Sequence, residues 1–396
     1  MDKKSILIIG GTGVISFAIV NEAIRQGYCV TCINRGKSRN QVLPPEVEVI
    51  KADYHNAEYI LSKIGDRVFD SVLDILCYKR EDISYSLNLF AKHCKQYFFF
   101  SSAEAYNKGK YKDEIYDETV ELVNPLWSYS INKAACEVEL IKLARKYNVK
   151  YTIIRPAITY GNTRIPYGIM PSYGYHGTLI KRMEHNKPTI LWNDGKNLAM
   201  ITRVEDFAIG FIGLIGNRKA FNQSFHIVGD EAYSWKSVTD CLADILNVTP
   251  IYISMPSDSY AAEIPMLSEQ LLGGRSIDQR LDNYKLKSVV PEFKTTIPLK
   301  LGISYTVEYY KSHNYLNVID WKFDADTDRI ISRYCKKNGL STEGMNLGFV
   351  DYLGSATIYD RLIYWLEFHK DNTMVRLCSK IVKLCNHVYN EIVKYL

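Results

Sequence analysis

Tyr129 and Lys133 are the residues of this sequence best placed for catalysis, because they lie four positions apart where a long helix is expected to begin. Residues at that spacing share one face of a helix, so the Lys133 ammonium would lie near the Tyr129 hydroxyl. A nearby positive charge stabilises the phenolate and lowers a tyrosine pKa from about 10 toward neutral pH. We therefore predict that Tyr129 acts as a base toward a substrate hydroxyl.

A glycine-rich turn, Gly10-Gly-Thr-Gly13-Val-Ile-Ser16, follows the first strand-like run and opens the first helix. At such a position, backbone N–H groups and the positive end of the helix dipole meet the pyrophosphate of a dinucleotide. Gly10 permits the tight turn and Gly13 lets the backbone approach the phosphates, whereas Ser16 is small enough for close helix packing. The turn therefore predicts a cofactor site that includes Gly10, Thr12, Gly13, Val14 and Ile15.

The second strand ends at Asn34, where NAD-selective proteins usually place an acid that binds the ribose 2′-hydroxyl. No acid stands here. Asn34 with Arg35 and Lys37 would favour the 2′-phosphate of NADP, or these cations are ordinary solvated loop residues. We expect NAD or NADP as the cofactor, with a slight preference for NADP.

Two later strand ends supply further polar side chains. Asp53 and Tyr54 follow the third strand, where they are expected at the cofactor's adenine side, although Asp53 could instead cap the helix that begins near Asn56. Ser101 and Ser102 end the fifth strand and supply the hydroxyl that would orient the substrate oxygen. The ordered set of glycine turn, strand-end serine and Tyr/Lys helix is difficult to explain as chance.

Two other Tyr-x-x-x-Lys pairs occur among the 30 tyrosines of the chain. Tyr106 and Lys110 flank Gly109 in a polar loop, where nothing holds them on one face. Tyr59 and Lys63 lie on the helix after the third strand, near the adenine side of the cofactor and away from its nicotinamide. Position therefore favours the pair that opens the long helix.

The elements that must position these residues alternate between short β-branched runs and amphipathic stretches, which predicts βαβ units and a parallel sheet. Strands are expected at Ser5–Ile9, Tyr28–Ile33, Val47–Lys51, Ser71–Ile75, Tyr97–Ser101 and Tyr151–Ile154. Helices are expected at Ile15–Arg25, Ala57–Ile64, Asp82–His93 and Ser130–Tyr147. The fold class is therefore α/β, with a doubly wound Rossmann-type sheet that binds its ligand at the carboxyl ends of the strands.

We divide the chain into a cofactor-binding domain at 1–165, a mainly substrate-binding region at 166–313 that is interleaved with the core, and a C-terminal helical extension at 314–396. A loop rich in Tyr, Gly and Pro, at 166–177, belongs to the substrate side. The last stretch places apolar residues at helical spacing: Val375, Cys378, Val382, Cys385 and Tyr389. It would pack on the core or on a second subunit, or lie on a membrane surface.

Composition bounds the remaining choices. The 396 residues are 47% hydrophobic and 23% charged, which excludes disordered and fibrous classes. No apolar run approaches the roughly 18 residues of a membrane span, and the nine scattered cysteines suggest reduced thiols, so a cytoplasmic protein is expected. A formal net charge of +5 is mild and predicts no dedicated nucleic-acid partner.

At this point the sequence resembles the extended short-chain dehydrogenase/reductase superfamily, in its nucleotide-sugar epimerase/dehydratase branch. The resemblance covers about residues 4 to 313. The segments that carry it are Gly10–Ser16, Phe100-Ser-Ser-Ala-Glu-Ala-Tyr106, Trp127-Ser-Tyr-Ser-Ile-Asn-Lys133, Arg155-Pro-Ala-Ile-Thr-Tyr-Gly161, Val204-Glu-Asp-Phe207, and Gly274–Asp278 with Asp282–Lys285.

The resemblance implies a role for each matching residue. Ser102 would lie beside the reacting sugar oxygen and Tyr129 would be the base. Lys133 would be its electrostatic partner and a ligand of the nicotinamide ribose. Pro156 would lie near the nicotinamide through its backbone, and Arg275 would bind the substrate diphosphate. A nucleotide-sugar substrate and a homodimer, with the Ser130–Tyr147 helix at its interface, are also implied.

Three positions bear on the reaction type. Glu104 matches a glutamate that resembling 4,6-dehydratases and decarboxylases carry beside the sugar ring, and thus suggests proton abstraction. Ala103 replaces the acid that one dehydratase subgroup uses to expel water, and Ile158 replaces the ligand-binding Asn of many epimerases. Epimerase and dehydratase stay joint predictions. The alternatives are an NAD(P)H-dependent keto-sugar or carbonyl reductase, and a non-catalytic cofactor- or RNA-binding relative.

Overall fold

The computed structural model describes residues 3–36, 41–111, 113–172, 174–351, 354, 356–379 and 381–382. Three residues named above lie outside the described residues: Lys37, Cys385 and Tyr389.

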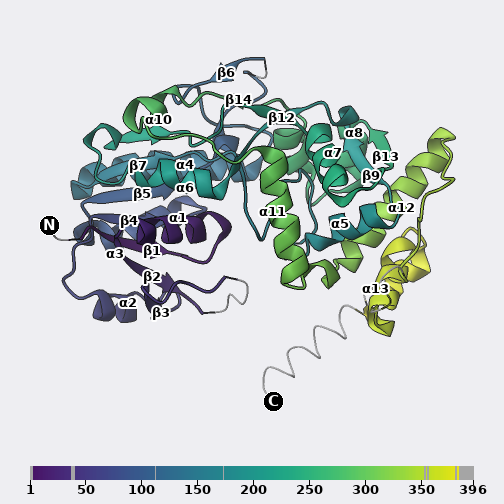
Figure 1. Cartoon of the computed structure of the whole chain (residues 1–396), viewed down its shortest axis with the longest axis horizontal. Coiled ribbons are helices and arrows are strands. Elements are labelled where there is room, and N and C mark those ends of the chain that lie inside the picture. The colour runs from purple at the N-terminus through teal and green to yellow at the C-terminus, as the bar shows by residue number, and fades with distance from the viewer. Residues whose placement is uncertain are drawn as a thin grey trace.

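A seven-stranded parallel sheet forms the centre of the first lobe, in the order β11-β7-β5-β4-β1-β2-β3 (Figure 1). Its strands are β1 (Ser5–Ile9), β2 (Cys29–Asn34), β3 (Glu48–Lys51), β4 (Ser71–Asp74), β5 (Gln96–Phe100), β7 (Lys150–Ile154) and β11 (Gln223–Phe225). The predicted α/β, Rossmann-type class is confirmed. The edge strand β11 was not anticipated, because a run of three residues carries too little pattern to be recognised.

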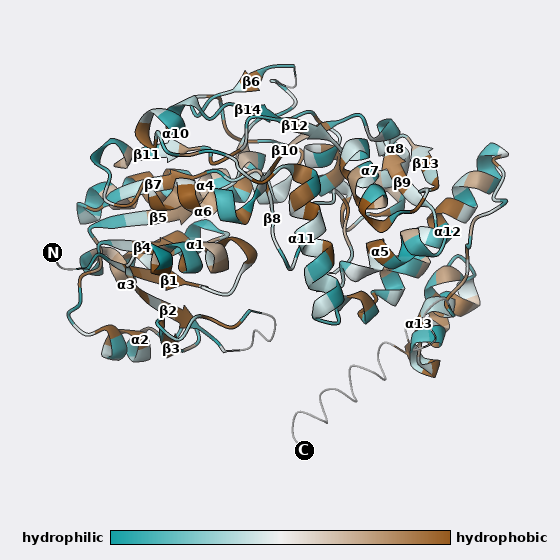
Figure 2. Ribbon diagram, in the orientation of Figure 1, coloured by the Kyte–Doolittle hydropathy of each residue, from teal (hydrophilic) through white to brown (hydrophobic). Residues whose placement is uncertain are grey.

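Apolar residues on successive positions of β1 explain why the sheet is covered on both faces (Figure 2). Ile6 and Ile8 pack into one core with α1 (Val14–Arg25) and α6 (Val204–Ile212). Leu7 and Ile9 face the other core, which α2 (Ala57–Ile64), α3 (Arg80–Phe90) and α4 (Ser128–Tyr147) complete. A strand that is buried on both faces has no polar alternation, which is typical of a parallel sheet between helical layers.

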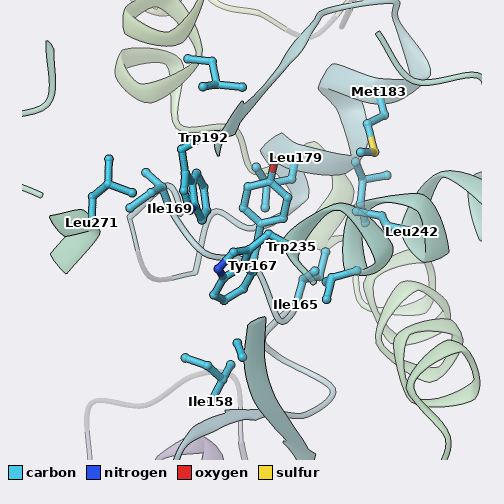
Figure 3. Close-up of a cluster of buried hydrophobic side chains, with 14 of the residues drawn as sticks. Ile158, Ile165, Tyr167, Ile169, Leu179, Met183, Trp192, Trp235, Leu242 and Leu271 are labelled. Atoms are coloured by element: carbon cyan, nitrogen blue, oxygen red, sulfur yellow. The ribbon is translucent and has the colours of Figure 1, made fainter. Parts of the chain in front are cut away.

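A second lobe follows the sheet and has its own core, in which Trp192, Trp235 and Tyr167 are buried (Figure 3). Its strands are β8 (Ile158–Tyr160), β9 (Thr189–Trp192), β10 (Leu198–Arg203), β12 (Ala232–Ser234) and β13 (Tyr252–Met255). Two short strands beside the main sheet, β6 (Ile115–Tyr116) and β14 (Arg280–Leu281), pair with each other. The helices of the second lobe are α5 (Gly177–Glu184), α7 (Trp235–Leu246), α8 (Ser257–Glu263), α9 (Ser268–Gln270) and α11 (Leu299–Ser312), whereas α10 (Tyr284–Val289) packs against the main sheet through Leu286.

The C-terminal extension contains α12 (Trp321–Asn338) and α13 (Ile358–Phe368), which lie side by side (Figure 1). Ile330 and Ile331 of α12 belong to the core of the second lobe. Asp320, which precedes α12, accepts a hydrogen bond from the Ser172 backbone N–H at 2.9 Å. The extension therefore shares a core with the second lobe and holds part of the 166–177 loop.

Residues 373–379 are helical, as the spacing of the C-terminal apolar residues predicts. Val375 and Val382 are half-buried, and Cys378 is exposed. Among the described residues, no helix is long and apolar enough to span a membrane.

Candidate active site

Three of the four predicted catalytic residues, Ser102, Glu104 and Tyr129, line a pocket of about 270 Å³ at the carboxyl edge of the sheet. Ser102 follows β5, Tyr129 lies in the first turn of α4, and Pro156 follows β7. The residues that line the pocket are Ile15, Ser102, Glu104, Trp127, Tyr129, Pro156, Ala157, Ile158, Thr159, Arg164, Gln270 and Arg275. Because Ile15 belongs to the first turn of α1, the pocket adjoins the glycine turn as well as the substrate side.

Lys133 lies one turn after Tyr129 on α4 and is almost completely buried. Its Nζ donates hydrogen bonds to the backbone carbonyls of Cys77 at 2.7 Å and Phe100 at 2.8 Å. The same Nζ lies 5.9 Å from the centre of the Tyr129 ring. Burial lowers the pKa of Lys133, although the charges of several neighbouring groups oppose this effect. These two hydrogen bonds hold the Lys133 ammonium group near the Tyr129 ring.

Tyr129 is half-buried, and its ionisation differs from the sequence-based expectation. Burial raises the pKa of Tyr129 to about 12, although a hydrogen bond with Ser102 lowers it. The charge of Glu104 raises the pKa further, whereas that of Arg275 lowers it. The expected net lowering of the Tyr129 pKa is therefore not found, because desolvation of the phenol outweighs the groups that lower it.

Ser102 and Glu104 are held by a short 3₁₀ helix, η2 (Ala103–Ala105), that directly follows β5. The Ser102 hydroxyl caps this helix by accepting a hydrogen bond from the Glu104 backbone N–H at 3.1 Å. The Ala103 N–H donates to the Pro156 carbonyl at 2.9 Å, so the segment after β5 is fixed to the segment after β7. Ser102 therefore has a defined position in the wall of the pocket.

Glu104 forms ion pairs with two cations inside the protein. Its Oε1 lies 2.6 Å from an Arg275 guanidinium nitrogen, and its Oε2 contacts the Lys108 ammonium. Burial would raise the pKa of Glu104, but Lys108 and Arg275 outweigh this effect and hold the pKa below its usual value. The predicted base and the predicted diphosphate ligand are thus brought together as ionic partners.

Lys108 is a buried charged residue beside the pocket that sequence reasoning missed. It is 1% exposed and lies in the loop after η2. Its signal was present, because Lys108 stands four positions after Glu104 and carries the complementary charge. That spacing indicates contact only on a helix, and here a turn brings the two groups together. Arg164, which lines the same pocket, was also missed because no motif marks it.

The glycine turn has the shape that a dinucleotide site requires. Gly10 has φ of +90°, a conformation that side chains disfavour. A Cβ at Gly11 would lie 2.6 Å from the Cys32 sulfur. The Ser16 hydroxyl accepts from the Gly13 N–H at 2.9 Å and donates to the Gly10 carbonyl at 2.6 Å. These bonds close the turn and leave the first backbone N–H groups of α1 at its open end.

The remaining predicted cofactor residues occupy different environments. Asn34 ends β2 and is buried, and within the described part of the chain its Nδ2 has no hydrogen-bond partner, whereas Arg35 is exposed. Asp53 is exposed and accepts from the His55 N–H at 2.9 Å. Tyr54 is buried and donates to an oxygen of Asp74 at 2.5 Å. An unpartnered buried amide beside the glycine turn fits a site that binds a polar ligand.

Helix α2 is capped by Asn56, whose side chain accepts from the Tyr59 N–H at 3.2 Å. The alternative that Asp53 caps this helix is therefore wrong, because Asp53 lies three residues too early and closes a turn of its own.

The two competing Tyr/Lys pairs do not form a comparable site. Tyr106 is buried and hydrogen-bonds with Arg155 at 2.7 Å and with His226 at 2.5 Å. Lys110 is exposed and pairs with Glu121 instead. On α2, Tyr59 and Lys63 lie at the protein surface, with the Lys63 Nζ 5.3 Å from the tyrosine ring.

A parallel sheet with a glycine turn, a strand-end serine and a Tyr/Lys helix defines an α/β dinucleotide-binding protein of the short-chain dehydrogenase/reductase type. The model of the NAD dependent epimerase/dehydratase family matches residues 6–227, and the chain belongs to this family. The family is described as NAD dependent.

Three similar proteins carry different functional names. A chloroplast stem-loop binding protein of 41 kDa from Arabidopsis thaliana is 26% identical over 61% of this chain and 63% of that protein, which is less than two thirds of its length. A UDP-N-acetyl-alpha-D-glucosaminuronate decarboxylase from Bacillus cytotoxicus is 24% identical over 78% of this chain and 98% of that protein. A solved UDP-glucose 4-epimerase from Thermotoga maritima is 21% identical, with a TM-score of 0.62 over 78% of this chain and 99% of that one.

Proposed function

We propose that this protein converts a nucleotide sugar by transient oxidation of one sugar hydroxyl to a ketone. The observation that carries the proposal is that Ser102 and Tyr129 line one pocket with Ile15 of the first turn of α1, while the Lys133 Nζ lies 5.9 Å from the centre of the Tyr129 ring. Two of the similar proteins are named for UDP-sugar substrates, which supports this substrate class.

The chain's own residues perform the proton chemistry. The Ser102 hydroxyl hydrogen-bonds with Tyr129 and orients the sugar oxygen, and Tyr129 takes the proton of the reacting hydroxyl. Lys133 uses two of its three N–H donors on the carbonyls of Cys77 and Phe100, which leaves one for the cofactor ribose. An oxidised nicotinamide, when bound, supplies the hydride acceptor and a positive charge that favours the Tyr129 phenolate.

The cofactor would be held by the glycine turn at Gly10 to Ile15, with Pro156 on the nicotinamide side. We propose that NADP is preferred over NAD, because β2 ends in Asn34 and is followed by Arg35 where an acid would repel a 2′-phosphate. Asp53 is exposed and free to meet the adenine amino group, whereas the Tyr54 hydroxyl is committed to Asp74.

Two alternatives use the same fold. A keto-sugar or carbonyl reductase would use Tyr129 and Lys133 in the opposite direction and would consume reduced cofactor. A non-catalytic or RNA-binding role is raised by the name of the chloroplast relative. The complete set of Ser102, Tyr129 and Lys133 favours catalysis, since a binding protein has no need for a serine and a tyrosine at one pocket with a buried lysine beside the tyrosine.

The test is turnover of a panel of nucleotide sugars by the protein and by Tyr129→Phe. The panel contains UDP-glucose, UDP-glucuronate, UDP-N-acetylglucosamine and TDP-glucose, with products read by mass spectrometry and NMR. Loss of general-base catalysis is expected to lower turnover by about 10²-fold or more, with unchanged melting temperature. Undiminished turnover by the variant would remove Tyr129 from its role.

We also propose a homodimer that forms through α4. Ile131 and Val138 of this helix are 44% and 61% exposed, and their spacing of seven residues places them on one face of the helix. Light scattering after size exclusion measures the mass directly. A change of Val138 to Lys is expected to yield monomers.

A further inference from the structure

A fully buried lysine beside the pocket has no part in the mechanism above. Lys108 is 1% exposed, and its ammonium contacts the Glu104 carboxylate and lies 3.4 Å from the Gly274 carbonyl oxygen. Burial lowers the pKa of Lys108, whereas the charge of Glu104 raises it. Burial of an ammonium group costs free energy of desolvation unless the group is paired with an anion. The role of Lys108 should therefore be sought in its ion pair with Glu104.

Glu104, the ionic partner of Lys108, is bound by a cation at each of its two carboxylate oxygens. One Glu104 oxygen lies 2.6 Å from Arg275, and the other contacts Lys108. Arg275 is itself fixed, because its carbonyl accepts hydrogen bonds from the indoles of Trp192 and Trp235, each at 3.0 Å. Neither carboxylate oxygen can turn away from its cation without breaking an ion pair inside the protein.

Such a carboxylate is a poor proton acceptor. Elimination of water after oxidation requires a base to take the proton from the carbon next to the ketone, while hydroxide leaves from the next carbon. A general base works best when its pKa lies near the operating pH, and a carboxylate bound by two cations is far from that condition. Return of the hydride to the ketone, with the proton from Tyr129, needs no such base.

We propose that Lys108 is a positioning residue that holds Glu104 as an ion-paired carboxylate toward Arg275, so that the oxidised sugar is reduced again to an epimer and does not lose water. The inference rests on the proposed function and narrows it from epimerase or dehydratase to epimerase. Lys108 acts through Glu104 and touches no substrate.

The groups that interact electrostatically with Glu104 come from four segments. Lys108 follows η2, Arg275 ends the short helix Leu271–Arg275, Tyr116 belongs to β6 and Tyr129 belongs to α4. Lys108 and Arg275 are the cations whose charges favour the ionised Glu104 carboxylate most strongly. Removal of Lys108 therefore takes away one of the two main charges that oppose its desolvation.

The first test needs no substrate. Urea denaturation is measured from pH 8 to pH 5 for the protein and Glu104→Gln, and again in the Lys108→Met background. A carboxyl whose folded pKa is depressed contributes stability that is lost only below its usual pKa. The difference in unfolding free energy between the unchanged protein and Glu104→Gln is therefore expected to stay constant over this pH range. In the Lys108→Met background the pKa of Glu104 is expected to rise. The difference in unfolding free energy between Lys108→Met and the double variant with Glu104→Gln is then expected to change with pH across this range.

Lys110→Met is the matched control, because Lys110 lies in the same loop but is exposed and pairs with Glu121. The Glu104→Gln difference is expected to stay constant in this background. A purely structural Lys108 would give the same flat profile in the Lys108→Met background, and that result would overturn the proposal. A slope already present in the unchanged protein would also overturn it.

The second test uses the unchanged protein, and so does not depend on the folding of any variant. The nucleotide sugar of the panel that is turned over is incubated in D₂O. The expected product is an isomer of the substrate without carbon-bound deuterium. A dehydrated product, or deuterium on carbon, would contradict the inference but not the proposed oxidation. If no sugar of the panel reacts, the proposed function fails while denaturation still decides the role of Lys108.

Discussion

Asp328 is expected to be the residue through which the C-terminal extension is fastened to the second lobe. It lies on α12, and its carboxylate is fully buried. One oxygen accepts a hydrogen bond from Arg182 at 2.9 Å, and the other contacts Lys187 and the Tyr364 hydroxyl. Asp324 lies in the same cluster, with one oxygen 3.2 Å from the Lys187 Nζ. Two buried basic and two buried acidic side chains thus form one cluster, with members on α5, on α12 and in the segment after α5, and with Tyr364 of α13 as a further partner.

The change Asp328→Asn keeps the shape and leaves one buried positive charge without compensation. Removal of one partner of a buried pair typically costs about 3–5 kcal/mol, because the other charge stays desolvated. Burial would raise the pKa of Asp328, but Arg182 and Lys187 outweigh it and hold the pKa below its usual value. The carboxyl is therefore ionised at neutral pH, and the full penalty applies there.

The measurement is urea denaturation at pH 7, followed by far-UV circular dichroism. Asp244→Asn is the control, because Asp244 pairs with Lys300 at 3.0 Å on the surface, where both side chains are more than half exposed. An exposed pair contributes about 0–1 kcal/mol, so this variant is expected to unfold close to the unchanged protein. An Asp328→Asn loss no larger than that of the control would refute the argument that this cluster fastens the extension.

Three further predictions concern the cofactor site and the pH range of the fold. Gly11→Ala is expected to weaken NADPH binding at least tenfold, measured by quenching of protein fluorescence, because the new Cβ would lie 2.6 Å from the Cys32 sulfur. Asn34→Asp is expected to shift the NADPH-to-NADH ratio of dissociation constants about tenfold toward NADH, since one repulsive carboxylate costs on the order of 1.4 kcal/mol. Burial lowers the pKa of His226 to about 3, so stability is expected to fall below pH 6.5 by about 1.4 kcal/mol per pH unit, and His226→Asn should flatten this decline in denaturation experiments.

The central sheet could be predicted largely because its inner strands β1, β4 and β5 are buried on both faces. Such strands are mainly apolar, and the strand Ser5–Ile9 and the helix Ala57–Ile64 are observed with the predicted bounds. The chemistry-bearing groups were predictable for a related reason, since the carboxyl ends of parallel strands meet at one edge. The edge strand β11 was not predicted from the sequence, because its pairing with β7 depends on tertiary contact and not on a local pattern.

The ionisation of the site residues could not be predicted, because it depends on depth and on neighbours far away in sequence. The spacing of Tyr129 and Lys133 is visible in the sequence, yet burial raises the pKa of Tyr129 to about 12. Arg275 reaches Glu104 across 171 positions, which no local pattern reveals. Glu104 shows how buried partners change the chemistry that a residue type suggests. Its residue type suggests a base, whereas Lys108 and Arg275 make it an ion-paired carboxylate. A motif therefore identifies which groups stand at the site, while their buried partners determine which reactions those groups can perform.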